Sequence, residues 1–100
     1  MDKHTLIKYL RNKKAELYEL YGITSIGIYG SYARDEATES SDVDIFYTRD
    51  RTISLKSGLE FLRIADMLAK ELQVPKVDFV SLDFMNPIVK HYAQKDFIYV

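Results

Sequence analysis

Two long stretches of helical periodicity frame this chain, and they set what it can fold into. In residues 3–21 the apolar side chains of Leu6, Leu10 and Leu17 recur at the spacing of one helical face. Residues 57–72 repeat the pattern, with the stripe Phe61, Ala65, Leu68 and Leu72. Each amphipathic helix needs an apolar surface to cover, and the segments between them must supply it.

Short runs of β-branched and aromatic residues provide that surface. They predict strands at 23–29, 42–48 and 77–82, with a fourth short strand at 97–100 and an edge strand at 52–55. The first two strands are joined without a long crossover helix, so we expect them to be antiparallel. The sequence thus predicts an α+β fold over residues 1–100, a mixed sheet of three to four strands packed by helices.

Capping residues mark the expected helix ends. Asp2 and Gly22 fit the start and end of the first helix, and Ser57 with Glu60 forms a capping box for the second. A short helix is expected within SYARDEA (31–37). A last helix is expected to begin at Asn86-Pro87, with its buried face formed by Ile88, Val89, Tyr92 and Ala93.

Composition excludes several classes of protein. Apolar residues make up 47% and charged residues 29% of the 100, which is typical of a globular chain. The formal net charge of -1 offers no surplus of Lys and Arg for a phosphate backbone, so we do not expect a nucleic-acid partner. No run approaches the roughly 20 apolar residues that cross a bilayer, and the charged N-terminus lacks a signal-peptide core. With no cysteine, the simplest expectation is a cytoplasmic protein without a membrane partner.

Three carboxylates are the candidate chemical centre. Asp42 and Asp44 are two residues apart on the second strand, so both should point to the face opposite Val43 and Ile45. Asp78 lies on the third strand, where the register can bring it alongside. Clustered carboxylates resist ionisation unless a cation intervenes, and Mg²⁺ suits such oxygen ligands together with substrate phosphates. The alternative is that Asp42 only begins the strand and Asp44 and Asp78 are solvated.

A Gly30-Ser31 turn precedes the short helix expected at 31–37. Glycine permits a tight turn and close backbone approach, and a helix start leaves backbone N–H groups free to bind an anion. A plain helix cap would look the same. Only beside a carboxylate pair does the turn indicate the second half of a phosphoryl- or nucleotidyl-transfer site.

The segment GSYARDEATESSDVDIF resembles the GS-x10-DxD pattern of the polymerase-beta-like nucleotidyltransferase superfamily. The order of the other elements resembles that of its smallest members, the minimal nucleotidyltransferases. Several of these resemble antitoxins paired with HEPN-family toxins. The resemblance implies an adenylyltransferase that moves AMP from ATP onto a tyrosine of a HEPN-type toxin.

The resemblance also implies roles for individual residues. Asp42, Asp44 and Asp78 would be catalytic and hold two Mg²⁺ ions, and Asp78 would also help activate the acceptor hydroxyl. Gly30, Ser31 and Arg34 would bind the nucleotide phosphates, with Arg34 also available to brace Glu36. Asp35 departs from the pattern, since relatives often have glycine there, and its charge would oppose ATP binding.

Two other functions remain open from the sequence alone. The chain could neutralise its partner by occlusion, as a non-catalytic binding module with relict carboxylates. Transfer to a small molecule, as in aminoglycoside-modifying relatives, would need a substrate pocket that 100 residues have little room to build. For a protein acceptor, the basic first helix and the C-terminal helix with its FIYV tail are the expected docking surfaces.

Overall fold

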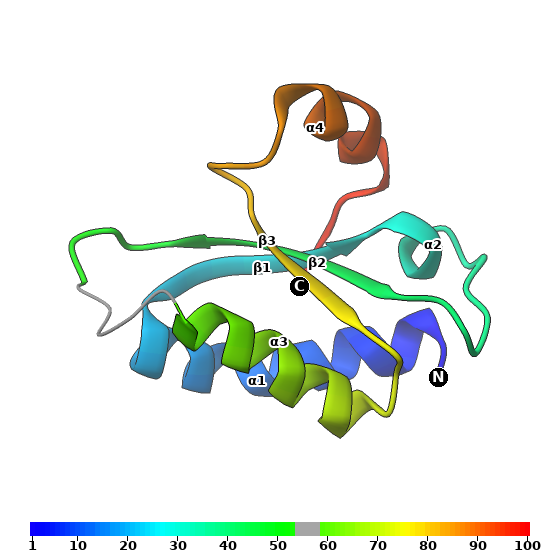
Figure 1. The fold of residues 1–100 in the computed structure, drawn as a ribbon, viewed down its shortest axis with the longest axis horizontal. Helices are drawn as coiled ribbons and strands as arrows, with labels where there is room; N and C mark the ends of the chain where they lie inside the picture. Colours follow the sequence, from blue (N-terminus) through cyan, green and yellow to red (C-terminus); the bar gives the residue numbers. More distant parts are fainter. Residues whose placement is uncertain (54–58) are drawn as a thin grey trace.

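The computed structural model describes residues 1–53 and 59–100, which form a sheet with helices on both sides (Figure 1). In chain order the elements are α1 (Lys3–Tyr21), β1 (Ile23–Tyr29), α2 (Gly30–Ala33), β2 (Val43–Arg49), α3 (Leu59–Leu72), β3 (Val77–Ser81), α4 (Pro87–Ala93), a 3-10 helix η1 (Gln94–Asp96) and β4 (Ile98–Tyr99).

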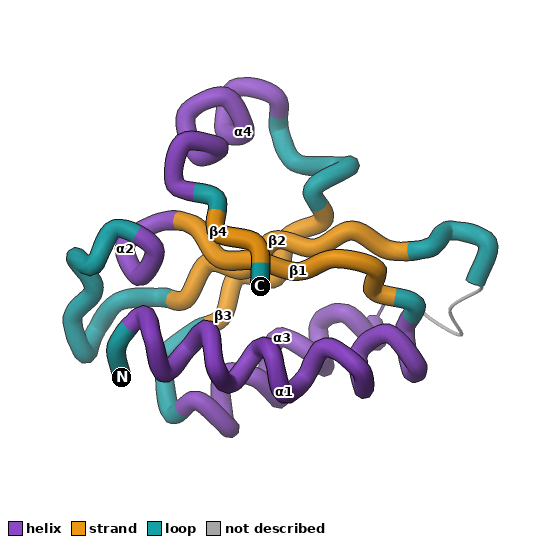
Figure 2. The backbone as a smooth tube through the Cα atoms, turned by 180° about the vertical axis from the view of Figure 1, so that it is seen from behind, coloured by secondary structure: helices purple, strands orange, loops and turns teal. Residues whose placement is uncertain are grey.

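The described strands, drawn in orange in Figure 2, form one sheet in the order β3-β2-β1-β4. β1 pairs antiparallel with both β2 and β4, whereas β2 and β3 run parallel. The predicted mixed sheet and the predicted antiparallel pairing of the first two strands are therefore confirmed. The register places Tyr29, Asp44 and Asp78 in one row across β1, β2 and β3.

The core lies between one face of this sheet and the helices α1 and α3 (Figure 1). The predicted stripe of α1 is buried there, and Ile64 and Leu68 provide the most buried side chains of α3. Strand residues that point to this face complete the core: Ile26, Ile28, Val43, Ile45, Tyr47 and Val77. Since alternate residues of a strand face opposite sides, burial of Val43 and Ile45 leaves Asp44 on the other face.

Stacked aromatic rings join α3 to the sheet. The ring of Tyr47 on β2 lies with its centroid 4.4 Å from that of Phe79 on β3 and 5.3 Å from that of Phe61 on α3. Rings packed in this way contribute beyond their buried area, by about 0.5–1.5 kcal/mol a pair. The stack therefore fixes α3 against the β3 side of the sheet.

The predicted caps form as expected at both ends of α1 and at the start of α4. The Asp2 carboxylate accepts the Thr5 N–H at 2.8 Å, and Gly22 ends the helix in the left-handed conformation at φ 72°. The Asn86 side chain accepts from the Ile88 N–H before Pro87 opens α4. These local signals position α1 and α4 in the chain.

The predicted burial of the α4 face is wrong. Ile88, Val89 and Tyr92 are 70%, 49% and 70% exposed. Figure 1 shows why: α4 lies away from the sheet, on the face opposite α1 and α3. Aromatic rings already cover that face, where Phe97 stacks on Phe46 with a centroid distance of 4.4 Å.

Other predicted elements differ in extent. α2 ends at Ala33 rather than reaching residue 37, because Asp35 adopts a left-handed φ of 59° that ends a right-handed helix. The Ser57 N-cap and residues 54 and 55 of the predicted edge strand lie outside the described residues. Thr52 and Ile53, which precede them, form a turn and a bend. None of the helices in the described ranges is both long enough and apolar enough to cross a bilayer.

Candidate active site

Asp44 and Asp78 form the centre of the site, because the parallel pairing of β2 and β3 places them directly opposite each other. Partial burial and, after it, the neighbouring carboxylates of Asp78 and Asp42 together raise the pKa of Asp44 to about 6. Arg34 opposes this shift through its positive charge. Two facing carboxylates of this kind favour a bound proton or a bound cation.

Asp42 was predicted to lie on the second strand, but β2 begins at Val43, so Asp42 immediately precedes the strand and is only partly buried. Its charge reaches Asp44, since it contributes to the raised pKa of that carboxyl group. Across residues 1–53 and 59–100, no three acidic or histidine side chains are already arranged as a metal-binding group. The structure brings together two of the three predicted ligands, and the role of Asp42 stays a prediction.

Gly30 begins α2 directly after β1, at φ 75°. A β-carbon at this position would overlap the Asp44 carboxylate, so only glycine allows the turn to lie against that side chain. Ser31 follows it in the first turn of α2. The turn therefore adjoins the carboxylates, as the sequence pattern predicts, and phosphate binding by these two residues stays a prediction.

Arg34 lies at the end of α2 between two carboxylates. Its Nε donates to Glu36 at 3.0 Å, as predicted, and its Nη1 donates to Asp96 at 3.0 Å. The second contact joins residues 62 apart in the chain, and no signal in the sequence indicates it. Asp96 thereby anchors α2 to η1, just before β4.

Asp35 takes the left-handed backbone conformation that glycine would supply in relatives. Its carboxylate is held by the Lys3 ammonium, with 2.8 Å between Nζ and Oδ2. Aspartate adopts this conformation more readily than most residues. The sequence does not indicate the counter-charge from Lys3, in the first turn of α1.

Lys76 is a further charged group beside the carboxylates. Its Nζ lies 3.1 Å from Oδ1 of Asp78, and the side chain is 65% exposed. The hydrogen bond to Asp78, with the charges of Asp42 and Asp44, raises the pKa of Lys76 above its ordinary value. Sequence reasoning missed this lysine, although its place two residues before Asp78 puts both on one side of the strand.

Comparison with known proteins shows the family of the chain. A family model described as "Nucleotidyltransferase domain" matches residues 10–99. The chain belongs to this nucleotidyltransferase family. The expected polymerase-beta-like fold and the expected class of enzyme are thereby confirmed.

Relatives of this nucleotidyltransferase occur in archaea. A Methanocaldococcus jannaschii protein, named as a candidate protein adenylyltransferase, is 41% identical over 92 residues, covering 91% of this chain and 90% of that one. The protein adenylyltransferase MntA of Thermococcus cleftensis is 34% identical over 87 residues, covering 87% of this chain and 84% of that one.

Solved structures show the same fold. A structure described as a minimal nucleotidyltransferase superposes with a TM-score of 0.72 at 30% identity, covering 98% of this chain and 95% of the other. A structure described as the toxin–antitoxin MntA–HpeT, in mutant form, gives a TM-score of 0.66 at 18% identity, covering 99% and 71%.

The side chains of the nucleotidyltransferase fit a magnesium site. Mg²⁺ usually takes one or two carboxylates and completes its sphere with waters and substrate phosphates. Asp44 and Asp78 supply that pair, and the raised pKa of Asp44 reflects a negative charge that a cation would relieve. Because Gly30 has no β-carbon, the Asp44 carboxylate has room beside the turn.

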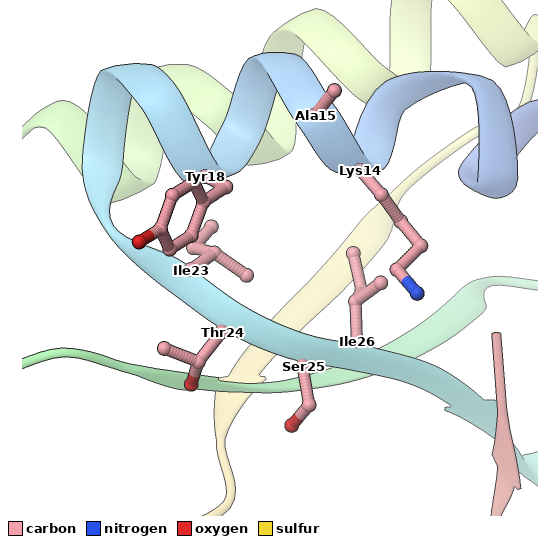
Figure 3. A pocket seen from close by; sticks show the side chains of 7 residues that line it. All are labelled: Lys14, Ala15, Tyr18, Ile23, Thr24, Ser25 and Ile26. Carbon is pink, nitrogen blue, oxygen red and sulfur yellow. The ribbon is translucent and has the colours of Figure 1, made fainter.

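A separate cavity of about 270 Å³ lies between α1 and β1 (Figure 3). Lys14 and Tyr18 of α1 point into it above Thr24 and Ser25 of β1. None of its lining residues belongs to the predicted site, so we assign it no part in the chemistry.

Proposed function

We propose that this nucleotidyltransferase moves AMP from magnesium-bound ATP onto a tyrosine hydroxyl of a HEPN-type toxin, and so acts as its antitoxin. The observation that carries the proposal is the pair Asp44 and Asp78, register-paired on β2 and β3 beside the Gly30 turn. Relatives named as protein adenylyltransferases support a protein acceptor. A shared fold with a toxin–antitoxin structure supports the kind of partner.

The proposed reaction is attack of the acceptor oxygen on the α-phosphorus of ATP. An O–P bond forms there, the bond from the α-phosphorus to the oxygen bridging the β-phosphate breaks, and pyrophosphate leaves. The hydroxyl proton passes to a carboxylate, which we assign to Asp78. Bound Mg²⁺, held by Asp42, Asp44 and Asp78, would neutralise charge on the attacking and leaving oxygens.

We assign phosphate binding to the turn after β1. The backbone at Gly30 and Ser31 would hold the β- and γ-phosphates, because the turn that carries these residues lies against the side chain of Asp44, a proposed metal ligand. Arg34 would add its guanidinium from the end of α2, held in place by Glu36 and Asp96. The leaving pyrophosphate then lies on the α2 side of the site.

Labelled ATP tests the proposal directly. The purified chain is incubated with Mg²⁺, ATP labelled on the α-phosphate and the protein encoded by the neighbouring gene, and the adduct is mapped by mass spectrometry. We expect AMP on one tyrosine of the partner, loss of transfer in Asp44→Asn, and normal transfer in the control Asp83→Asn, an exposed carboxylate paired with Arg51.

The occlusion alternative makes the opposite prediction. If the chain only blocks its partner, the Asp44→Asn variant should bind and neutralise the toxin as well as the unsubstituted chain does. Neither chain should then form an adduct. Label confined to this chain's own tyrosines, or to added RNA, would contradict transfer to a partner protein.

A further inference from the structure

A groove of about 470 Å³ runs between α3 and the outer edge of the sheet, next to the proposed catalytic pair. Asp78 and Lys76 of the β3 side line it together with Phe79 and, from α3, Phe61 and Leu62. Asp78 therefore lies on the strand edge that the groove follows, while its side chain shares the opposite face of the sheet with Asp44.

The direction of the reaction points to this groove. In an in-line displacement the attacking oxygen approaches the phosphorus from the side opposite to the leaving group. We place the leaving pyrophosphate at Gly30, the residue after Tyr29. Tyr29 begins the row that crosses the sheet from β1 through Asp44 to Asp78. Continuing along this row from Asp44 past Asp78, the next position is the open outer edge of β3, and the groove follows that edge on the α3 side. The acceptor hydroxyl therefore has to arrive over β3.

The edge of β3 can itself bind a peptide. In the sheet of the described residues β3 pairs with β2 on one side only, so main-chain N–H and C=O groups face outward on the other. An extended segment can add to such an edge, with main-chain hydrogen bonds for affinity and side-chain pockets for specificity. The rings of Phe61 and Phe79, 6.5 Å apart, and the 64% exposed Leu62 offer the apolar contacts.

We infer that an extended segment of the acceptor protein docks along the outer edge of β3, in the groove beside α3, and presents its tyrosine hydroxyl to Asp78. The inference rests on the proposed function and adds the surface that recognises the substrate. The charged residues of the groove are Asp66, Lys76 and Asp78, and the rest of its lining is apolar, so the segment that fits it is largely apolar.

A second apolar surface competes for this role. Ile88, Val89 and Tyr92 of α4 line a cavity of about 450 Å³ whose other wall is formed by Gly30 and Arg34. That cavity adjoins the turn assigned to the leaving pyrophosphate, so an acceptor bound there would approach the α-phosphorus from the wrong side.

Lysine substitutions at three matched positions test the inference. Leu62 in the groove, Ile88 on α4 and Leu20 on α1 are 64%, 70% and 61% exposed, so none should disturb the core. Each variant is assayed for thermal stability, for Mg²⁺-ATP affinity, and for the KM of transfer to the HEPN-type partner identified by labelling.

For Leu62→Lys we expect the KM for the partner to rise about tenfold, which corresponds to about 1.4 kcal/mol. Its ATP affinity and melting temperature should stay unchanged. Leu20→Lys and Ile88→Lys lie on the first and last helices, which the sequence alone predicts as docking surfaces. If the groove is the acceptor site instead, both variants should remain within about twofold of the unsubstituted chain in all three measurements.

Two results would overturn the groove while leaving the proposed function intact: an unchanged KM in Leu62→Lys, or a rise confined to Ile88→Lys or to Leu20→Lys. If the unsubstituted chain labels no HEPN-type partner, the proposed function itself is wrong and the groove inference fails with it.

Discussion

The carboxylate of Asp44 lies against the α-carbon of Gly30, in the space that a β-carbon at position 30 would fill. Gly30 also has a φ of 75°, which places it in the left-handed region. Two independent constraints, contact and backbone conformation, therefore act at the turn that adjoins the proposed metal ligands.

Gly30→Ala should consequently abolish nucleotidyl transfer and lower the free energy of unfolding by at least about 1–2 kcal/mol, the strain of a left-handed residue. Gly22→Ala is the matched control, because Gly22 has a φ of 72° but lies at the end of α1, away from the site. We expect that control to lose stability and to retain transfer, as measured by urea unfolding and by labelled ATP. Equal activity in the two variants would contradict the role of the turn.

Asp44→Asn keeps the shape of the side chain and removes one charge from the pair with Asp78. Because the two carboxylates repel each other, the variant should be as stable as the unsubstituted chain or slightly more stable, while transfer is lost. Circular-dichroism melting beside the transfer assay separates the two effects. A clear loss of stability would instead indicate that Asp44 has a structural role.

The pH dependence of the free energy of unfolding should also reflect the titration of Asp44. Its pKa rises from 3.8 to about 6 on folding, so between these values the folded chain binds more protons than the unfolded one. The contribution of Asp44 to stability therefore falls as the pH rises through this window. Urea unfolding at pH 4.5 and 7.5 should show this fall in the unsubstituted chain relative to Asp44→Asn, and parallel profiles would contradict it.

Magnesium with ATP should reverse this repulsion. A ligand at 100 times its dissociation constant stabilises the folded state by about 2.7 kcal/mol. In a domain of this size, each kcal/mol of stabilisation raises the melting temperature by about 4 °C or more. We expect a larger shift with Mg²⁺ and ATP together than with either alone, since the phosphates complete the metal sphere. No shift under any of the three conditions would exclude the site.

Much of this arrangement follows from local sequence signals. The helical stripe of α1, the β-branched runs and the caps at Asp2, Gly22 and Asn86 all act over a few residues, and each formed as predicted. The facing pair of Asp44 and Asp78 could also be predicted from the sequence, because alternation along a strand decides which side chains share a face.

The tertiary contacts could not be predicted in the same way. The bond from Arg34 to Asp96 and the pair Lys3 with Asp35 join residues 62 and 32 positions apart, and surface charges offer many equivalent partners. The exposure of Ile88 on α4 was missed for a related reason. Helical periodicity indicates which side of a helix is apolar, but it does not say whether the fold brings another surface to cover that side.

The pair of Lys3 and Asp35 leads to a last prediction, on the residue that departs from the family pattern. With 2.8 Å between Nζ and Oδ2, the Lys3 ammonium offsets the charge of Asp35, which follows directly after the proposed phosphate ligand Arg34. Lys3→Ala should therefore weaken ATP binding about two- to threefold at low salt, in line with the 0.2–1 kcal/mol of an exposed ion pair. The effect should fade at high ionic strength.

Replacing Asp35 separates the charge from other consequences of losing the lysine. In an Asp35→Gly background, where glycine also suits the φ of 59°, Lys3→Ala should no longer change ATP affinity. Lys13→Ala is the control, because Lys13 pairs with Glu71 at 2.9 Å and has no contact with the site. Calorimetric titration with Mg²⁺-ATP at two salt concentrations measures all five chains, which are the unsubstituted one, the three single variants and the double variant. An equal loss of affinity in both backgrounds would show that Lys3 acts on the nucleotide by another route than Asp35.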